Sequence, residues 1–237
     1  MREAALITGS AVRIGKEIAL ALADLGFDIA LHYHRSKTEA IRTKEQIRNS
    51  GVDCEIFSCD LADEKDVLKL IPRVKQKFPS LALLVNNASI FSKSRFGKSS
   101  LKTFISHFEA NFKAPYILSC QFADVCKKGH ILNMLDANIT QTKTAYADYL
   151  LFKKALANFT EMAAVQFAPG IRVNGIGPGP ILSPPGERGN RLQRVARTLP
   201  LKRAGNPNQI VQAVQFLTEH SYVTGQIIFV DGGQHLT

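Results

Sequence analysis

The stretch AALITGSAVRIG, residues 4–15, joins a short apolar run to a loop that contains two glycines. The run predicts a β-strand and the residues after the loop predict a helix, so the loop lies at a strand-to-helix turn. Gly9 and Gly15 are spaced as in loops that bring bare backbone close to a phosphate. Arg13 stands where such a loop usually has its middle glycine. The alternative is that the turn needs glycine only for its backbone angles.

Apolar strands alternate with amphipathic helices along the whole chain. Strands are predicted over residues 4–8, 27–33, 54–59, 81–85, 131–135, 172–176 and 226–230, and helices over 14–25, 37–49, 64–77, 101–127, 147–167 and 207–219. We therefore predict an α/β fold, a Rossmann-type doubly wound parallel sheet of about seven strands. No linker or repeat interrupts the pattern, so residues 1–237 are expected to form a single domain. The proline- and glycine-rich segment 177–191 is expected to be a lid or binding loop.

The composition is that of a globular protein, with 45% hydrophobic residues and a mean hydropathy of -0.04. A net charge of +10 raises nucleic-acid binding as an alternative, but the basic residues are scattered, so we expect anionic small ligands and no nucleic acid. The four cysteines have neither CxxC nor zinc-site spacing. We therefore expect no metal site, no disulfide framework and a reducing cytoplasm. The absence of a long apolar run or signal sequence predicts no membrane association.

The second predicted strand ends in LHYHRS. Dinucleotide-binding folds place an acid here when they bind the 2′-hydroxyl of NAD, and this sequence has none. His34, Arg35 and Ser36 offer donors suited to a phosphate, so NADPH is the predicted cofactor, and a solvated basic turn is the alternative. Asp60, just after the third strand, is expected to accept from the adenine edge. Its alternative role is to cap the next helix, for which Asp63 competes.

Tyr149 and Lys153 are four residues apart on a predicted helix and so share one face. A tyrosine has a pKa of about 10 in water and is a poor acid or base at neutral pH. An ammonium group one turn away and an oxidised nicotinamide nearby would lower that pKa. The alternative is an exposed helix pair without function. The pair follows the stretch LVNNAS, residues 84–89, by some sixty residues.

The motifs TG-x-x-x-R-I-G, N-N-A-S, Y-x-x-x-K and IRVNGIGPGPI together resemble the short-chain dehydrogenase/reductase family over essentially the whole chain. Four features resemble more narrowly the pteridine reductases and the bacterial dihydromonapterin and dihydrofolate reductases. They are Arg13, the HYHRS strand end, Phe91 and Asp136. Most of the wider family has a serine at the position of Asp136.

The resemblance implies a role for each matching residue. Tyr149 would donate a proton, Lys153 would hold the nicotinamide ribose, and Asp136 would act with Tyr149 in protonating a pterin. Phe91 would stack the pterin against the nicotinamide. For Phe91 the alternative is a place in the core, and for Asp136 it is a strand-end cap. The implied catalytic residues are Asp136, Tyr149, Lys153 and Asn111. The implied cofactor-binding residues are Gly9, Arg13, Ile14, Gly15, His34, Arg35, Ser36, Asp60, Leu61, Asn87, Ala88, Ser89, Lys153, Pro178 and Gly179. The implied substrate-binding residues are Arg13, Ser89, Phe91, Asp136, Tyr146 and Tyr149.

Two of these residues have more specific expectations. Asn111 would support Lys153 through a water, and Tyr146 would border the substrate, with simple packing as the alternative. Arg13 would neutralise the pyrophosphate and still reach the polar edge of the pterin. The resemblance also implies a homotetramer that assembles through helix faces and the C-terminal strand.

The predicted function is NADPH-dependent reduction of a pterin, dihydropterin or dihydrofolate. Reduction of a C=N bond puts hydride on carbon and needs a proton on nitrogen, so a carboxylic acid beside the tyrosine is useful. The alternative within the family is an NADPH-dependent carbonyl reductase, such as a 3-oxoacyl thioester reductase. A non-enzymatic NADP-binding regulator is a third possibility, against which the intact Tyr149–Lys153 pair argues.

Overall fold

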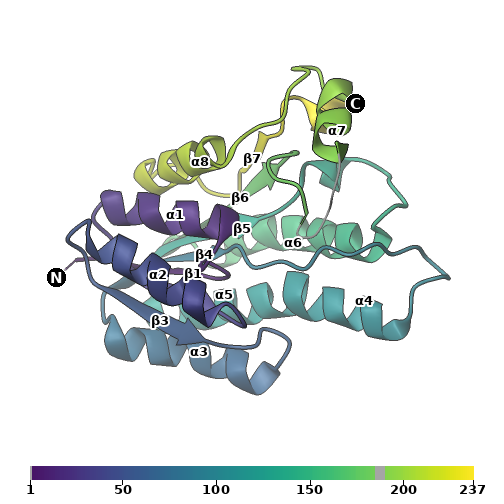
Figure 1. Ribbon diagram of the computed structural model, residues 1–237. Coiled ribbons are helices and arrows are strands. Elements are labelled where there is room, and N and C mark those ends of the chain that lie inside the picture. The colour runs from purple at the N-terminus through teal and green to yellow at the C-terminus, as the bar shows by residue number, and fades with distance from the viewer. Residues whose placement is uncertain (1, 185–189) are drawn as a thin grey trace.

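The computed structural model describes residues 2–184 and 190–237 (Figure 1). Within these residues, seven parallel strands form one sheet in the order β3-β2-β1-β4-β5-β6-β7. The strands are β1 (Ala4–Ile7), β2 (Asp28–Tyr33), β3 (Cys54–Ser58), β4 (Leu81–Asn86), β5 (Gly129–Met134), β6 (Ile171–Pro178) and β7 (Ile227–Val230). The order reverses between β1 and β4, which is the crevice where such sheets bind ligands. The predicted doubly wound α/β fold is confirmed.

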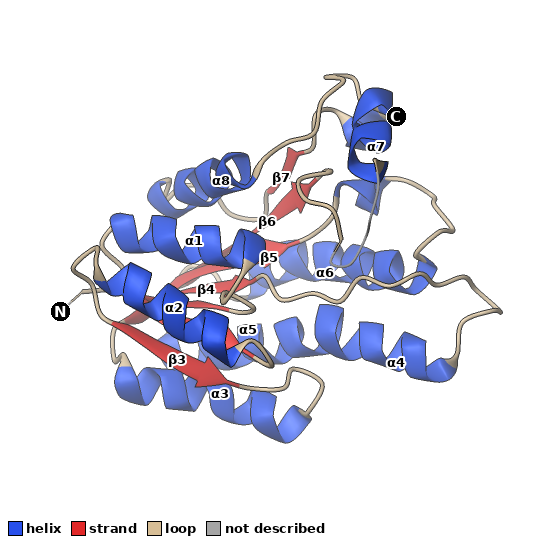
Figure 2. Ribbon diagram, in the orientation of Figure 1, coloured by secondary structure: helices blue, strands red, loops and turns tan. Residues whose placement is uncertain are grey.

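Helices cover both faces of the sheet (Figure 2). They are α1 (Arg13–Asp24), α2 (Lys37–Arg48), α3 (Glu64–Lys77), α4 (Leu101–Phe108), α5 (Ala114–Cys126), α6 (Ala147–Gln166), α7 (Arg191–Thr198) and α8 (Pro207–Glu219). One hydrophobic core joins α1, α2 and α8 to the sheet, and a second joins α3, α5 and α6 to its other face. All four residues of β1 are buried because this strand lies between the two cores.

The structure differs from the sequence prediction in two helical segments. The helix predicted over 101–127 is divided by a π-helical turn, Glu109–Lys113, at which Asn111 is fully buried. Such turns carry an extra residue and are frequent at functional sites, but the hydrophobic period does not reveal them. Helix α7 was not predicted, because it is two turns long and follows a stretch rich in proline and glycine. Residues 185–189 of the expected loop lie outside the described residues.

Candidate active site

A cavity of about 670 Å³ opens at the carboxyl ends of the central strands, beside the start of α1. Its lining comprises Arg13, Ile14, Asn87, Ser89, Ile90, Phe91, Met134, Leu135, Asp136, Asn138, Tyr149, Lys153, Pro178, Gly179, Pro180, Leu182, Ser183, Pro184, Arg191, Leu192, Val195 and Gln234. Ten of the residues singled out in the sequence are therefore brought together here: Arg13, Ile14, Asn87, Ser89, Phe91, Asp136, Tyr149, Lys153, Pro178 and Gly179. The position agrees with the rule that open α/β sheets bind ligands at the switch in strand order.

The glycine loop enters α1 without a side-chain cap, and the first turn of the helix has no acidic residue. Gly9 has a φ of +65°, so its position does require glycine backbone freedom. A Cβ on Gly15 would lie 2.4 Å from the carbonyl oxygen of Gly9, so this glycine permits close packing of the turn. Arg13 adopts a φ of +58°, a left-handed conformation that a glycine would adopt without strain. Nη2 of this arginine donates to the carbonyl oxygen of Ser183 at 2.7 Å, so its side chain joins the glycine loop to the segment that follows β6.

Two neighbouring strands hold this loop. The N–H of Gly9 donates to Nδ1 of His32 at 2.9 Å, and Nε2 of His32 lies 3.1 Å from the carbonyl oxygen of Cys59. The imidazole therefore carries its proton on Nε2 and accepts at Nδ1. On the other side, Nδ2 of Asn87 donates to the carbonyl oxygens of Thr8 and Gly9 at 2.8 and 3.2 Å. His32 was not recognised from the sequence, although strand alternation places it on the same face as His34, two residues on.

Burial lowers the pKa of His32 to about 4, against about 6.5 in an unfolded chain. Between these values the unfolded chain binds the proton and the folded protein does not, so folding stability falls as the pH falls. We expect the free energy of unfolding of the wild type to drop between pH 7 and pH 5 by about 2 kcal/mol more than that of His32→Gln. Denaturant unfolding of both proteins at the two pH values measures this difference. An identical pH dependence would show that His32 is not buried in its neutral form.

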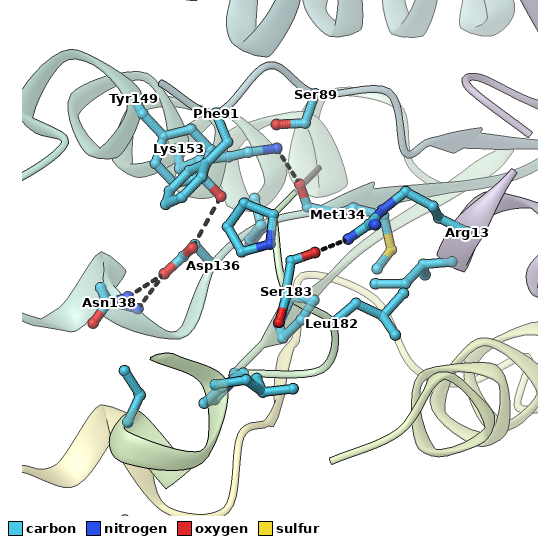
Figure 3. Close-up of a pocket in the computed structure, with 18 of the residues that line it drawn as sticks. Arg13, Ser89, Phe91, Met134, Asp136, Asn138, Tyr149, Lys153, Leu182 and Ser183 are labelled. Atoms are coloured by element: carbon cyan, nitrogen blue, oxygen red, sulfur yellow. Dashed lines mark hydrogen bonds between the residues drawn. The ribbon is translucent and has the colours of Figure 1, made fainter. Parts of the chain in front are cut away.

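Tyr149 and Asp136 meet in the cavity, where the phenol of Tyr149 donates to Oδ2 of Asp136 at 2.9 Å (Figure 3). The other carboxylate oxygen, Oδ1, accepts from the backbone N–H and from Nδ2 of Asn138, each at 2.7 Å. Asp136 is thus the cap of the short helix Ala137–Thr140 and a partner of Tyr149 at the same time. The two interpretations that the sequence offered for Asp136 do not exclude each other.

Lys153 is 2% exposed, and its ammonium donates to the carbonyl oxygen of Met134 at 2.7 Å. Burial lowers the pKa of Lys153 to about 8. Its Nζ lies 5.9 Å from the centre of the Tyr149 ring. The pKa of Tyr149 is raised well above its usual value, first by burial and then by the charge and hydrogen bond of Asp136. The lowered tyrosine pKa expected from Lys153 is therefore not found in the protein alone, because burial and Asp136 have the larger effect.

Asn111 organises the loop that follows β4. Its Oδ1 accepts from Oγ of Ser89 at 2.8 Å and from the N–H of Ile90 at 3.1 Å, while its Nδ2 donates to the carbonyl oxygen of Ile90. Nδ2 also lies 3.1 Å from Nδ1 of the buried His107. The side chain thus fixes the loop that carries Ser89. The water-mediated support of Lys153 stays a prediction.

Phe91 is 41% exposed and lies on the cavity wall, so it is not a core residue. Its ring stacks on Tyr146 at 4.3 Å between centres and meets the edge of Tyr149 at 4.8 Å. Tyr146 has a φ of +62° and lies behind Phe91 instead of lining the cavity itself. In the protein alone, Tyr146 packs against Phe91.

The expected adenosine end lies at the carboxyl ends of β2 and β3. Nε2 of His34 is 3.6 Å from Oδ2 of Asp60. Asp63 caps α3 by accepting from the N–H of Lys65, so Asp60 is not the cap of that helix. Arg35 is exposed, and Ser36 precedes α2 without making a side-chain cap. Oδ1 of Asp60 accepts from the N–H of Ala62 at 3.0 Å. The expected contacts of these four residues with the cofactor stay predictions.

The remaining sequence candidates lie around the cavity without lining it. They are Gly9, Gly15, Leu61, Ala88, Asn111, Tyr146 and the adenosine-end residues His34, Arg35, Ser36 and Asp60. Ala88 nevertheless contacts the glycine loop, since a Cβ on Gly9 would lie 3.1 Å from it. Its N–H donates to Oγ1 of Thr8 at 3.0 Å.

The sequence did not single out several of the lining residues, among them Asn138, Leu192, Val195 and Gln234. Leu192 and Val195 are three residues apart, a helical spacing that could have indicated α7. Gln234 donates to Oδ1 of Asn138 at 3.1 Å, so the C-terminal turn supports the residue that holds Asp136. No local pattern could have revealed that contact across 96 positions.

Comparison with known proteins places the chain in a family. The family model described as enoyl-(acyl carrier protein) reductase matches residues 9–235. The chain belongs to the short-chain dehydrogenase/reductase family. This short-chain dehydrogenase/reductase is an oxidoreductase. Arg13 of its nucleotide loop and the Tyr149–Lys153 pair line the same cavity.

Its relatives carry different names, and some of these names state an activity. It is 32% identical to general stress protein 39 of Bacillus subtilis over 98% of this chain and 84% of that protein. It is 30% identical to the 3-oxoacyl-[acyl-carrier-protein] reductase FabG of Staphylococcus epidermidis over all of both chains. The solved structure of FolM alternative dihydrofolate reductase 1 from Brucella suis in complex with NADP is similar at a TM-score of 0.94. That comparison has 35% identity and covers 99% of this chain and 96% of the other.

The described residues, 2–184 and 190–237, also bear on two other classes of protein. No helix among them combines the length and the apolar character needed to cross a membrane. Across residues 2–184 and 190–237, no group of three or more His, Cys, Asp or Glu side chains is arranged to hold a metal ion.

Proposed function

We propose that this enzyme uses NADPH to reduce a C=N bond of a dihydropterin or dihydrofolate. The observation that carries the proposal is the 2.9 Å hydrogen bond from Tyr149 to Asp136 inside the cavity. Reduction of C=N requires protonation of nitrogen, and two acidic groups side by side suit that step better than one phenol. Phe91, on the wall beside Tyr149, offers a face for a flat ring. The similarity to the FolM structure supports the same substrate class.

The residues present fit an NADP(H) molecule. The first turn of α1 has free N–H groups without a competing side-chain cap, as a pyrophosphate requires. Arg35 and Ser36 would hold the 2′-phosphate, and Lys153 and Asn87 would lie along the nicotinamide half. The cofactor, when bound, supplies the hydride. FolM of Brucella suis was solved with NADP, which supports this assignment.

Each catalytic side chain then has a defined task. Tyr149 is neutral because its pKa is raised, so it holds the proton that the substrate nitrogen needs. Asp136 is half-buried, and its Oδ2 accepts a hydrogen bond from the hydroxyl of Tyr149. Through this hydrogen bond Asp136 can return a proton from water to the phenol. The ammonium of Lys153 lies near enough to offset negative charge on the phenolate that remains. Asn138 keeps the carboxylate oriented by its two hydrogen bonds.

A second candidate is reduction of a 3-oxoacyl thioester. FabG of Staphylococcus epidermidis matches this chain over its full length, and this observation favours the candidate. A carbonyl substrate needs a hydroxyl to stabilise its oxygen and gains little from a carboxylate at that point. The location of Asp136 therefore favours the imine-like substrate over the ketone.

The proposed function is tested by a substrate panel. NADPH oxidation is followed with dihydrobiopterin, dihydromonapterin, dihydrofolate and acetoacetyl-CoA under one set of conditions. The proposal expects the highest kcat/KM with a member of the pterin group. Good turnover of the thioester without turnover of any pterin compound would establish the second candidate.

Arg35→Ala is expected to reduce the preference for NADPH over NADH. Arg35 would contribute a charge-assisted hydrogen bond to the 2′-phosphate, which NADH lacks, so the ratio of the two kcat/KM values should fall by about tenfold. Arg48→Ala, at the other end of α2, is the matched control and should leave the ratio unchanged. If the ratio stayed constant in Arg35→Ala, the phosphate would have to bind elsewhere.

The proposal includes assembly as a homotetramer in a reducing cytoplasm. Large apolar side chains are exposed on α4, α5 and α6, among them Ile105, Tyr116, Leu151, Met162 and Val165. Val165 is 81% exposed, and faces of this kind mark protein contacts. The four cysteines are free thiols, which supports a reducing compartment. Sedimentation analysis measures the oligomeric state directly.

A further inference from the structure

A second hollow, of about 440 Å³, lies beside the active-site cavity. It is formed by the loop between β4 and α4 together with the residues that precede α6. Three basic side chains line it: Lys93, Arg95 and Lys98. The hydroxyls of Ser99 and Thr103 are engaged locally, with the backbone of Arg95 and with Oγ of Ser100, so the basic side chains are the groups left for a ligand. None of the described residues that line the hollow is acidic.

The three basic side chains have no carboxylate partner among residues 2–184 and 190–237. Other surface lysines do have one, such as Lys44 with Glu55 and Lys77 with Asp53. Three positive charges gathered without compensation repel one another and attract anions. Helix α4 also begins here, and its N-terminus adds partial positive charge. The hollow therefore suits a ligand group with more than one negative charge.

One pair of stacked rings separates this hollow from the active site. Tyr146 lines the hollow, Phe91 lines the active-site cavity, and their ring centres are 4.3 Å apart. A ligand whose flat ring rests on Phe91 can extend past the edge of this pair into the hollow. Figure 1 shows the loop between β4 and α4 running alongside α6, which carries Tyr149.

The loop is tied to the catalytic helix. The backbone carbonyl of Ser94 accepts from the N–H of Ala147 at 3.2 Å, and its Oγ accepts from the N–H of Asp148 at 2.9 Å. Ser94 is 5% exposed and in effect caps α6 from a distant part of the sequence. Since Tyr149 is the next residue of that helix, the basic hollow has a fixed position relative to the proton donor.

We propose that this hollow binds the carboxylates of a tail attached to the reduced heterocycle. The inference rests on the proposed function and specifies its substrate. Dihydrofolate carries an aminobenzoyl-glutamate tail with two carboxylates, whereas an unconjugated dihydropterin carries no anionic tail. The hollow therefore selects dihydrofolate, with Lys93, Arg95 and Lys98 as specificity-determining residues.

The test compares wild type with the triple variant Lys93→Gln/Arg95→Gln/Lys98→Gln. The KM for dihydrofolate should rise by about tenfold with kcat retained, since the exposed charges act on binding and not on chemistry. Both constants for dihydrobiopterin should stay unchanged. The control Lys69→Gln/Lys75→Gln/Lys128→Gln removes the same charge from α3 and from the end of α5. It should leave KM and kcat unchanged for both substrates. Added salt should raise the wild-type KM for dihydrofolate alone.

Several outcomes would overturn the inference while leaving the proposed function intact. One is an unchanged KM for dihydrofolate in the triple variant, and another is an equal rise in KM for dihydrofolate and dihydrobiopterin. A third is a rise in KM for acetoacetyl-CoA alone, which would assign the hollow to the phosphates of a thioester carrier. If neither pterin compound were reduced, the proposed function would fail. In that case equilibrium binding of p-aminobenzoylglutamate to the wild type and to the triple variant still decides whether the hollow holds the tail.

Discussion

Tyr149→Phe is expected to lower kcat for the pterin substrate on the order of 10³-fold, because the variant has no proton to give to the substrate nitrogen. The ring itself should stay in place, since Phe91 meets its edge and His107 lies 6.2 Å from its centre. The affinity for NADPH, measured by fluorescence titration, should therefore be unchanged.

Tyr222→Phe is the control for this experiment. Tyr222 is fully exposed and does not line the cavity, so its variant should keep wild-type turnover. Retained turnover in Tyr149→Phe would mean that another group donates the proton. Loss of NADPH affinity would mean that the substitution had disturbed the fold of the site.

Asp136→Ser should impair reduction of a C=N bond more than reduction of any ketone. The substitution removes the carboxylate that accepts from Tyr149 and leaves a hydroxyl in its place. We expect a loss of about 10²-fold in kcat for the pterin substrate, the usual contribution of one acid–base group. The ratio of pterin to acetoacetyl-CoA turnover is the measured quantity.

Asp136→Asn separates the chemical role of this residue from its structural role. An asparagine can still accept from the backbone N–H of Asn138, so the cap of the short helix Ala137–Thr140 is retained. The selective loss should therefore appear in Asp136→Asn as well. Equal losses for both substrates in the two variants would remove the argument that the carboxylate serves C=N chemistry.

Much of the fold could be predicted because it depends on local periodicity. Alternating apolar strands and amphipathic helices determine a parallel sheet, and the spacing of Tyr149 and Lys153 on a helix places them on one face whatever surrounds them. The glycine loop was recognisable since it lies between a strand and a helix. Asp136 and Phe91 were identified by resemblance, and the structure places both on the cavity wall.

The contacts that could not be predicted join distant parts of the chain. Nη2 of Arg13 donates to the carbonyl oxygen of Ser183, 170 residues away, at 2.7 Å. The left-handed backbone of Arg13 and the hydrogen bond of Gly9 to His32 likewise depend on tertiary packing. The raised pKa of Tyr149 depends on burial, which the spacing to Lys153 does not reveal. Such features arise only when the sheet has formed and the loops meet above it.

Transfer of label from deuterated NADPH shows whether the C=N bond of the pterin ring receives the hydride. The enzyme is incubated with NADPH that carries deuterium at the reactive carbon of the nicotinamide, together with dihydrofolate, and the product is analysed by mass spectrometry. We expect one deuterium on the ring carbon of the reduced C=N bond, and we expect Tyr149→Phe to form almost none of this product. An unlabelled pterin, together with deuterium in the alcohol formed from acetoacetyl-CoA, would contradict this expectation.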